Sequence, residues 1–314
     1  MKLSIVATLY QSAPYIEEFY RRASAAAQRL TDDYEIVLVN DGSPDDSLSR
    51  AVRITETDSR VVLIDLSRNF GHHKAMMTGL SYAQGERVFL IDSDLEEEPE
   101  WLIEFSNQME NDGCDVVYGV QEKRKGGFFE RWSGAWFWRL FNVLTGMAIP
   151  ENVVTARLMT RRYVDALLLH CEREVFFAGL LQITGFNQSQ KIVKKHNTSH
   201  TSYNLRRKIA LFIVAITSFS ETPLVMIFYI GFLLFLSSLG YLFFILIRWV
   251  IYSQQILGWT SLIASIWLLG GLTILFIGVL GIYLSRIFLE TKARPITIVR
   301  HIYRGKRTME DTSP

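Results

Sequence analysis

Cysteine is scarce in this chain of 314 residues, which contains only Cys114 and Cys171. These two lie far apart and in no metal-binding or redox spacing, so we expect both to be reduced packing residues in a cytosolic compartment. A charge imbalance is also absent, because the net charge is only +1, and this argues against a nucleic-acid partner. Residues 1–11 hold one Lys and a very short apolar run, which is too short for a secretory signal and fits a first strand.

Two phosphate-binding sequence motifs are missing as well. No G-x-G-x-x-G follows the first expected strand, and no P-loop pattern, G-x-x-x-x-G-K before Ser or Thr, occurs anywhere. Their absence argues against a dinucleotide-dependent oxidoreductase and against a P-loop NTPase.

Charge nearly disappears between Thr222 and Ser285, where Arg248 is the only charged residue. The apolar segment divides into 223–247 and 259–284, each of about 25 residues and long enough to cross about 30 Å of hydrocarbon. We therefore expect a transmembrane hairpin at 222–286 rather than a buried helix pair of a soluble protein. Basic residues flank it on both sides, which places residues 1–205 and both termini in the cytoplasm. These basic residues are Arg206, Arg207 and Lys208 before it and Arg286, Lys292, Arg294, Arg300, Arg304, Lys306 and Arg307 after it.

Residues 1–205 alternate short apolar runs with longer amphipathic ones. The runs predict strands at 2–9, 35–40, 61–66, 87–91 and 115–120, and helices at 14–30, 45–57, 71–84 and 99–111. Such alternation is typical of βαβ units with a parallel sheet and right-handed crossovers. We expect an α/β domain with a mostly parallel, Rossmann-like sheet.

Two carboxylates, Asp92 and Asp94, follow the buried strand at 87–91. Open α/β sheets bind ligands at the carboxyl ends of their strands, and alternation turns both side chains to the same side. Carboxylate oxygens suit Mg²⁺ or Mn²⁺, which usually share their ligand shell with substrate phosphates. The alternative is that these acids, with those at 96–98, only cap the helix that Pro99 begins.

Other polar residues stand at the ends of the neighbouring strands. Asp41 follows the second strand and could accept a hydrogen bond from a base or ribose, although a turn or cap role is equally open. Arg68 follows the third strand as a phosphate clamp, and Gly71 permits a close backbone approach. We expect His72 and His73 to be hydrogen-bonding or surface residues rather than metal ligands.

The order of three segments resembles glycosyltransferase family two, with its GT-A fold. They are LVNDGSPDD at 38–46, LSRNFGHHKAMMTGL at 66–80 and LIDSDLEEEPE at 90–100. The segments 151–163, 218–224 and 281–295, together with the two expected spans, look like the polyprenyl-phosphate glycosyltransferases of that family. This group includes the dolichol-phosphate mannose synthases and the bacterial undecaprenyl-phosphate glucosyltransferases.

The resemblance implies roles for individual residues. Asp41 matches the base-recognition acid, Asp92 and Asp94 match the metal and diphosphate acids, and Glu96 falls where the family often has a Gln near the metal. The implied metal ligands are Asp92, Asp94 and Glu96, for Mg²⁺ or Mn²⁺, and the implied catalytic residues are Asp94, Arg157 and Arg68. The implied substrate-binding residues are Leu9, Tyr10, Asp41, Ser67, Asn69, Gly71, Asp92, Ser93 and Thr155.

The chain departs from the family pattern in two places. Residues 7–12 read ATLYQS where the family usually has Pro-x-Tyr-Asn-Glu, which leaves the donor nucleotide, UDP or GDP, open. Thr155 stands where the family has the Asp proposed as catalytic base. Arg157 is retained, and we expect it to hold the acceptor phosphate.

Two further segments are expected to lie in the membrane interface. The aromatic-rich helix at about 126–147 carries Trp and Phe at helical spacing, and the basic residues 123–125 before it favour the anionic inner leaflet. The alternative for this helix is a place in the soluble core. A second interface helix is expected at 206–221, and a basic tail at 287–314.

The sequence therefore predicts an inverting, metal-dependent glycosyltransferase of a bacterial inner membrane. It would move a sugar from a UDP- or GDP-sugar to undecaprenyl phosphate at the cytoplasmic face, for cell-surface glycan modification. Membrane lipids and, by resemblance, a homotetramer are its expected partners. One alternative is transfer to a hydroxyl of a lipid-linked glycan, and another is a membrane-anchored binder of nucleotide sugars without catalysis.

Overall fold

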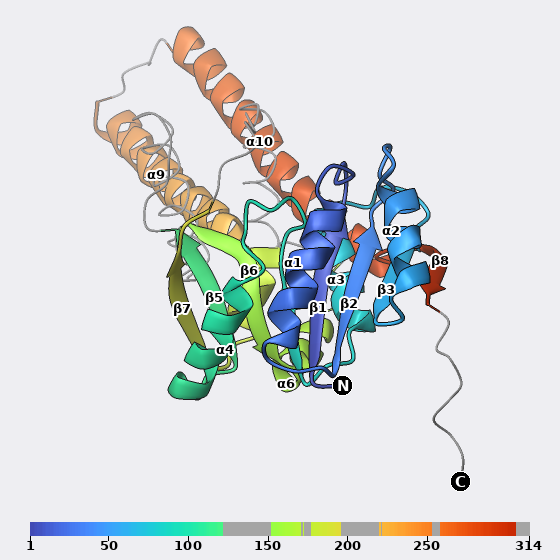
Figure 1. The fold of residues 1–314 in the computed structure, drawn as a ribbon. Helices are drawn as coiled ribbons and strands as arrows, with labels where there is room; N and C mark the ends of the chain where they lie inside the picture. The colour runs from blue at the N-terminus through green and yellow to red at the C-terminus, as the bar shows by residue number, and fades with distance from the viewer. Residues whose placement is uncertain are drawn as a thin grey trace. The chain divides into compact units, whose positions relative to one another are not determined.

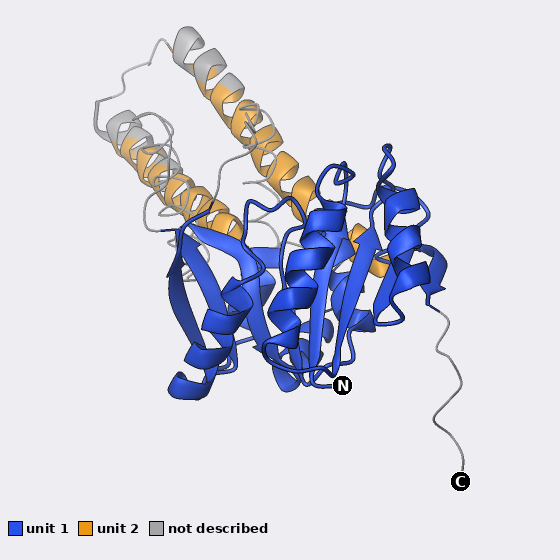
Figure 2. Cartoon of the chain, in the orientation of Figure 1, with its two compact units in different colours: residues 1–138, 148–205, 294–314 blue, residues 139–147, 206–293 orange. Residues whose placement is uncertain are grey.

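The computed structural model describes residues 1–121, 152–170, 172, 177–195, 220, 222–252 and 258–305. The chain divides into two compact units, coloured in Figure 2. The first unit comprises 1–138, 148–205 and 294–314, and the second comprises 139–147 and 206–293. The chain thus leaves the first unit twice, at 139–147 and at 206–293, and returns to it each time.

The first unit is built on an eight-stranded sheet with the strand order β7-β5-β6-β4-β1-β2-β3-β8 (Figure 1). Pairing is parallel among β4, β1, β2 and β3 and between β5 and β7, whereas β6 and β8 run antiparallel to their neighbours. The α/β class with a mostly parallel sheet is therefore confirmed. The strands are β1 Leu3–Leu9, β2 Tyr34–Asn40, β3 Val61–Leu66, β4 Arg87–Leu90, β5 Val116–Gln121, β6 Val153–Thr160, β7 Gln188–Val193 and β8 Val299–Arg304.

Helices cover the sheet, and every residue of β1 and β2 is buried, as parallel strands require. Helix α1 turns Phe19, Ala23 and Ala27 into the core at helical spacing, and burying a side chain such as Phe19 stabilises the fold by about 1.5–3 kcal/mol. Helix α3 approaches the sheet closely at Gly79, where a Cβ would lie 2.5 Å from Val6 Cγ1. The helices of this unit are α1 Ile16–Gln28, α2 Ser47–Thr57, α3 His72–Tyr82, α4 Trp101–Asp112, α6 Arg161–Leu168 and α7 Phe177–Ile183.

The strand order reverses beside β1, which has β2 on one side and β4 on the other. This is a topological switch point, and open α/β sheets bind ligands outside the carboxyl ends of the strands there. Val6 of β1 is paired with Leu90 of β4, so two residues further along both strands come Thr8 and Asp92. The fold therefore places the ends of β1 and β4 at the position expected for a ligand.

The segment expected to be only a basic tail contains a strand. Strand β8 pairs antiparallel with β3 at the edge of the sheet. Just before it, the Ser67 N–H donates to Ile298 O at 2.9 Å, and the hydroxyls of Thr78 and Thr297 lie 2.7 Å apart. The charged residues of this stretch conceal its strand character, because only Ile302 and Tyr303 provide apolar side chains toward the end of the strand.

The second unit contains α9 Thr222–Tyr252 and α10 Trp259–Thr291. Within the described residues, one helical stretch of 24 residues, Leu268–Thr291, is long and apolar enough to cross a membrane, and a window of 18 residues within it has a mean hydropathy of 2.2. Thr222–Leu234 is a shorter apolar stretch, so the two-span hairpin stays a prediction. The expected interface helices at 126–147 and 206–221 lie outside the described residues, Ser220 apart.

Candidate active site

The turn at residues 92–95 after β4 is tied to the end of β1. The Ser93 hydroxyl donates to Thr8 O at 2.7 Å and lies 3.0 Å from the Ser12 hydroxyl, and Ser93 is buried. Leu95 completes the turn with a φ of 60°, an uncommon conformation for a residue with a side chain. Because Ser93 is held inside, the backbone that carries Asp92 and Asp94 is fixed in place.

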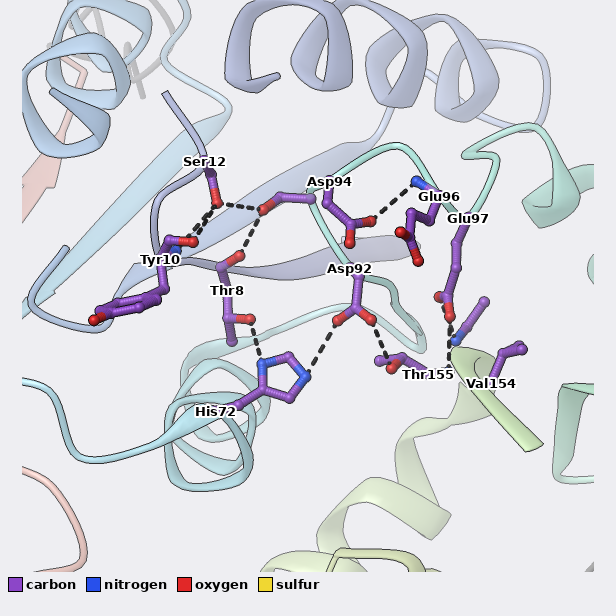
Figure 3. A network of polar contacts seen from close by, with 12 residues as sticks. Thr8, Tyr10, Ser12, His72, Asp92, Asp94, Glu96, Glu97, Val154 and Thr155 are labelled. Carbon is purple, nitrogen blue, oxygen red and sulfur yellow. Dashed lines mark hydrogen bonds and ion pairs between the residues drawn. The ribbon is translucent and has the colours of Figure 1, made fainter. Parts of the chain in front are cut away.

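Both oxygens of the Asp92 carboxylate face a neighbouring side chain (Figure 3). The Thr155 hydroxyl donates to Oδ2 at 2.8 Å, and His72 Nε2 lies 3.2 Å from Oδ1. The contact with His72 is close but not aligned as a hydrogen bond, so Oδ1 is buried without one among the residues that the structure describes. The other ring nitrogen of His72 lies 3.0 Å from Thr8 Oγ1, which makes His72 the hydrogen-bonding residue expected from the sequence.

These contacts and the burial of the site shift the pKa values of Asp92, Asp94 and His72. Burial raises the pKa of Asp92, but the partners His72 and Thr155 outweigh it and hold the pKa below its ordinary value. For Asp94, burial is the largest effect and the nearby charge of Asp92 adds to it, so its pKa is raised. Burial lowers the pKa of His72, yet Asp92 more than compensates, and the net pKa is raised. Asp92 and Asp94 therefore repel each other, and a bound cation would relieve this repulsion.

The oxygen atoms at this site suit a cation whose ligand shell is completed by a substrate. Asp94 Oδ1 accepts the Glu96 N–H at 3.0 Å, and the Glu96 carboxylate lies 3.1 Å from Lys195 Nζ. In the part of the chain that the structure describes, no group of three or more His, Cys, Asp or Glu residues could hold a metal. Asp92, Asp94 and Glu96 thus do not form a three-carboxylate cage here. Asp92 and Asp94 fit Mg²⁺ or Mn²⁺ because Asp92 Oδ1 is left without a hydrogen bond, and Mg²⁺ usually takes one or two carboxylates plus substrate phosphates.

Glu97 is a site residue that the sequence analysis missed. Its carboxylate is fully buried and accepts the backbone N–H groups of Thr155 at 2.9 Å and Ala156 at 2.8 Å. Burial, supported by the charge of Asp92, raises the pKa of Glu97 to about 8. Glu97 ties the turn after β4 to β6 and so sets the position of Thr155. Nothing in the run of three acids at 96–98 distinguishes the middle one.

Arg157 lies on β6 and is buried, with 5% of the residue exposed. It donates to Thr155 O at 3.0 Å and Val154 O at 3.1 Å, and its guanidinium carbon lies 5.5 Å from the centre of the Phe177 ring. Its described partners are therefore carbonyls and a ring rather than a carboxylate. Burial accordingly lowers its pKa.

Arg157 lines a cavity of about 390 Å³ in the first unit. Thr155, His72, Glu97 and Lys195 lie on the wall of this cavity, and its apolar lining comes from Met76, Val153, Val154, Phe177 and Leu181. A buried cation that has no direct contact with a carboxylate among the described residues, beside an apolar wall, suits a ligand that is anionic at one end and apolar at the other.

Asp41 holds the loop that follows β3. Its two carboxylate oxygens accept the backbone N–H groups of Phe70 at 2.7 Å and Gly71 at 3.0 Å, and the residue is buried. Burial outweighs these bonds and raises its pKa. At Gly42, with a φ of 61°, a Cβ would lie only 2.5 Å from Asn69 N. Asp41 and Gly42 therefore hold the loop at 68–71, and a contact of Asp41 with a base stays a prediction.

The remaining expected residues lie around this loop and the end of β1. Arg68 donates to Asn69 O and stacks over the Phe70 ring at 4.1 Å, and it is not among the residues that line the cavity. Leu9 is buried in the core, whereas Tyr10 is 49% exposed. Arg68 thus does not share the cavity that Arg157 lines.

The sequence matches the model of one protein family. Residues 4–168 match the model of glycosyl transferase family 2. A protein of Mycobacterium tuberculosis described as "Putative glycosyltransferases" is 48% identical over 313 residues, covering 100% of this chain and 92% of that protein. The prophage-derived bactoprenol glucosyl transferase of Shigella flexneri is 33% identical over 310 residues, covering 97% of this chain and 99% of its own length.

Among solved structures, glucosyl-3-phosphoglycerate synthase of Mycobacterium tuberculosis, in complex with Mn²⁺, UDP and phosphoglyceric acid, aligns with a TM-score of 0.47 at 19% identity. The alignment covers 69% of this chain and 76% of that one. The family match spans β1 to α6 and includes both carboxylates of the turn after β4. Together with the two relatives, which match over nearly the whole chain, it shows that this protein is a glycosyltransferase with a GT-A fold that belongs to glycosyl transferase family 2.

Proposed function

We propose that this protein transfers a sugar from a nucleotide-sugar donor to a polyprenyl phosphate at the cytoplasmic face of a membrane. The observation that carries the proposal is Arg157, a buried cation on the wall of a partly apolar cavity, with carbonyls and a ring as its described partners. A lipid phosphate offers both the charge and the apolar chain that this cavity suits. The bactoprenol glucosyl transferase of Shigella flexneri, similar over nearly the full length, supports the same acceptor.

The donor would lie at the carboxyl ends of β1 and β4. Asp92 and Asp94 would hold Mg²⁺ or Mn²⁺, which when bound neutralises the charge that develops on the leaving diphosphate. The loop at 68–71, held by Asp41, stands at the end of the neighbouring strand β3 and would complete the nucleotide site. UDP and GDP both remain candidates for the nucleotide.

The reaction would need no general base. A phosphate monoester has a second pKa of about 6, so near pH 7 it already presents an unprotonated oxygen. This oxygen would bond to the anomeric carbon of the sugar as the bond from that carbon to the diphosphate breaks, with inversion and release of the nucleoside diphosphate. Arg157 would hold the acceptor phosphate, and Thr155 would keep its hydroxyl on Asp92.

Transfer to a hydroxyl is less well supported by the same residues. A hydroxyl acceptor requires a base to remove its proton. Among the described residues, the carboxyl groups near Thr155 are those of Asp92 and Glu97, and both already accept hydrogen bonds from residues of β6. A catalytically inactive binder is the remaining alternative, and a turnover assay decides it.

The proposed membrane topology rests on the fact that the chain returns to the first unit after α10. Because β8 pairs with β3, residues 299–304 lie on the same side of a membrane as the sheet. The intervening helices must then cross an even number of times. With α10 as one crossing, α9 would be the other, and the flanking basic residues put the sheet in the cytoplasm. A bacterial inner membrane and a role in cell-surface glycans are part of the same proposal, and a homotetramer stays an expectation from the family.

The test is an assay of the full-length protein in lipid nanodiscs that contain undecaprenyl phosphate, with a panel of UDP- and GDP-sugars. Transfer of one sugar to the lipid supports the proposal, and Arg157→Ala should raise the apparent KM for the lipid at least about 100-fold, the scale of one strong electrostatic contact. Binding of a nucleotide sugar without transfer to any lipid would leave the inactive binder as the function.

A further inference from the structure

Four residues from four elements form one chain of polar contacts in the first unit. Thr8 Oγ1 lies 3.0 Å from His72 Nδ1, His72 Nε2 lies 3.2 Å from Asp92 Oδ1, and Thr155 Oγ1 donates to Asp92 Oδ2 at 2.8 Å (Figure 3). They come from β1, the first residue of α3, the turn after β4, and β6. The chain of contacts therefore spans the carboxyl-end edge of the sheet on both sides of the switch point.

The contacts close into a ring at Thr8. Its side chain meets His72, and its carbonyl accepts the Ser93 hydroxyl at 2.7 Å. Ser93 is the next residue after Asp92. Thr8 therefore holds the backbone of Asp92 through Ser93 and contacts its carboxylate through His72. A ring of this kind fixes the rotation of the Asp92 side chain as well as the path of its backbone.

The two nitrogens of His72 have separate partners. The neutral tautomer with its proton on Nε2 satisfies both contacts, because Nε2–H then faces the Asp92 carboxylate and Nδ1 accepts the Thr8 hydroxyl. In that tautomer the Thr8 hydroxyl donates to Nδ1, and the Nε2–H of His72 is left facing Asp92. Histidines and hydroxyls that hold a carboxylate in this way commonly orient metal ligands.

The carboxylate that results is asymmetric. Thr155 occupies Oδ2 with an aligned hydrogen bond, whereas Oδ1, buried and beside His72, has none from the described part of the chain. One oxygen is thus anchored, and the other keeps a lone pair for a further partner. Asp94, two residues on, provides the second carboxylate.

We propose that His72 is a positioning residue, which with Thr8 and Thr155 orients Asp92 Oδ1 toward a divalent cation shared with the donor diphosphate. This rests on the metal-dependent reaction proposed above. His72 does not itself react with the sugar or the acceptor. Its contribution is to reduce the freedom that the Asp92 side chain would lose when the cation binds.

The experiment compares substitutions that keep one contact of His72 and remove the other. A Gln side chain places its amide nitrogen near the position of Nε2, so His72→Gln keeps a donor for Asp92. Asn is shorter and reaches only the region of Nδ1, so His72→Asn keeps the neighbour of Thr8 and loses Asp92. Thr8→Val removes the hydroxyl at nearly constant shape, and Thr8→Ser retains it. His301→Gln, on the exposed face of β8, is the matched histidine control.

The main readout is Mn²⁺ affinity of the full-length protein in detergent with UDP or GDP present, followed by electron paramagnetic resonance. We expect His72→Asn to weaken Mn²⁺ binding about 10–100-fold, the usual cost of losing a residue that holds a metal ligand. His72→Gln and Thr8→Ser should recover most of this affinity, Thr8→Val should fall between, and His301→Gln should equal the wild type. Melting temperatures measured without metal show whether a variant that loses Mn²⁺ affinity is still folded.

The outcomes are distinct. Wild-type Mn²⁺ affinity in His72→Asn would overturn the inference while leaving the proposed reaction standing. Equal loss in His72→Asn and His72→Gln would also overturn it, because the contact of Nε2 with Asp92 would then not matter. If His72→Asn does not fold, the comparison of Thr8→Val with Thr8→Ser decides, and equal affinity in these two overturns the inference. A wild-type protein that binds no divalent cation with either nucleotide would instead refute the metal dependence of the proposed function, and the inference with it.

Discussion

The Thr155 hydroxyl donates to Asp92 Oδ2 at 2.8 Å, which joins β6 to the turn after β4 through a neutral group. This position holds the proposed catalytic Asp in the polyprenyl-phosphate glycosyltransferases that the sequence resembles. A second carboxylate there would face Asp92 at hydrogen-bond distance and would repel it. With Thr at this position, Asp92 receives a hydrogen bond where an Asp would repel it.

Removing the Thr155 hydroxyl should cost little if the acceptor is a phosphate. We expect Thr155→Ala to retain activity within about tenfold, roughly the value of one hydrogen bond, and Thr155→Ser to be closer to the wild type. The measurement is the single-turnover rate with saturating donor between pH 6 and 8. A fall of about 1,000-fold in Thr155→Ala would instead be the loss expected for a general base.

Asp94 should be essential for turnover because it would bind the divalent cation. EDTA should abolish turnover, and Mg²⁺ or Mn²⁺ should restore it. Asp94→Asn should lower kcat/KM at least about 100-fold, the scale for one strong electrostatic contact. Asp45→Asn, a substitution of an acid that binds Ser43 and Ser47, is a control for removing a carboxylate outside the turn after β4. Undiminished activity in Asp94→Asn would refute its assignment as a metal ligand.

The raised pKa of Glu97 predicts how stability depends on pH. Burial raises this pKa from 4.5 to about 8, so between these values the folded protein retains a proton that the unfolded chain releases. Stability without metal should therefore fall as pH rises through this window and level off above about pH 8. Glu97→Gln should flatten the fall. It should also lower the free energy of unfolding by about 1–3 kcal/mol at low pH, because its amide group cannot accept both backbone N–H groups of β6.

Thermal unfolding in EDTA from pH 5 to 9 checks this prediction. Glu56→Gln, in an exposed position of α2, is the matched control and should keep the slope of the wild type. A melting temperature that rises with pH across the same window would contradict the assignment.

The proposed hairpin predicts a labelling pattern in intact cells. In a background without Cys114 and Cys171, a cysteine at position 254 should react with an impermeant maleimide added outside. Cysteines at Glu56 and His301 should react only after the cells are opened, because both positions lie in the unit that contains the sheet. External labelling of His301→Cys with protection of Glu56→Cys would mean an odd number of crossings.

The expected strands and helices of the first unit were located closely by the sequence, since β1 to β5 each combine an apolar run with a turn signal. Asp92, Asp94 and Arg157 were named on a different ground, because they fall in short motifs that resemble those of the family, and their roles stay predictions. Pairwise contacts between distant segments could not be read in this way. The bond of Asp41 to the backbone of Phe70 and Gly71 depends on how two loops approach each other at Gly42.

Glu97 and β8 were missed for related physical reasons. Glu97 differs from Glu96 and Glu98 only in the direction that its side chain takes after the turn at Leu95, and no local pattern encodes that direction. Strand β8 has a basic composition, and its place is fixed by the free edge of β3 rather than by its own propensity. His72 was expected to be a hydrogen-bonding or surface residue, and the sequence could not show that it meets Thr8 of β1 and Asp92 in the turn after β4.

The central claim is that a lipid phosphate is the acceptor. The most direct measurement offers the full-length protein undecaprenyl phosphate and undecaprenol, each in nanodiscs, with the donor sugar that is turned over. The account predicts transfer to the phosphate alone, at a rate that changes little from pH 7 to 8, where the phosphate is already ionised. Transfer to the alcohol, or to a lipid-linked glycan in place of the phosphate, would contradict it.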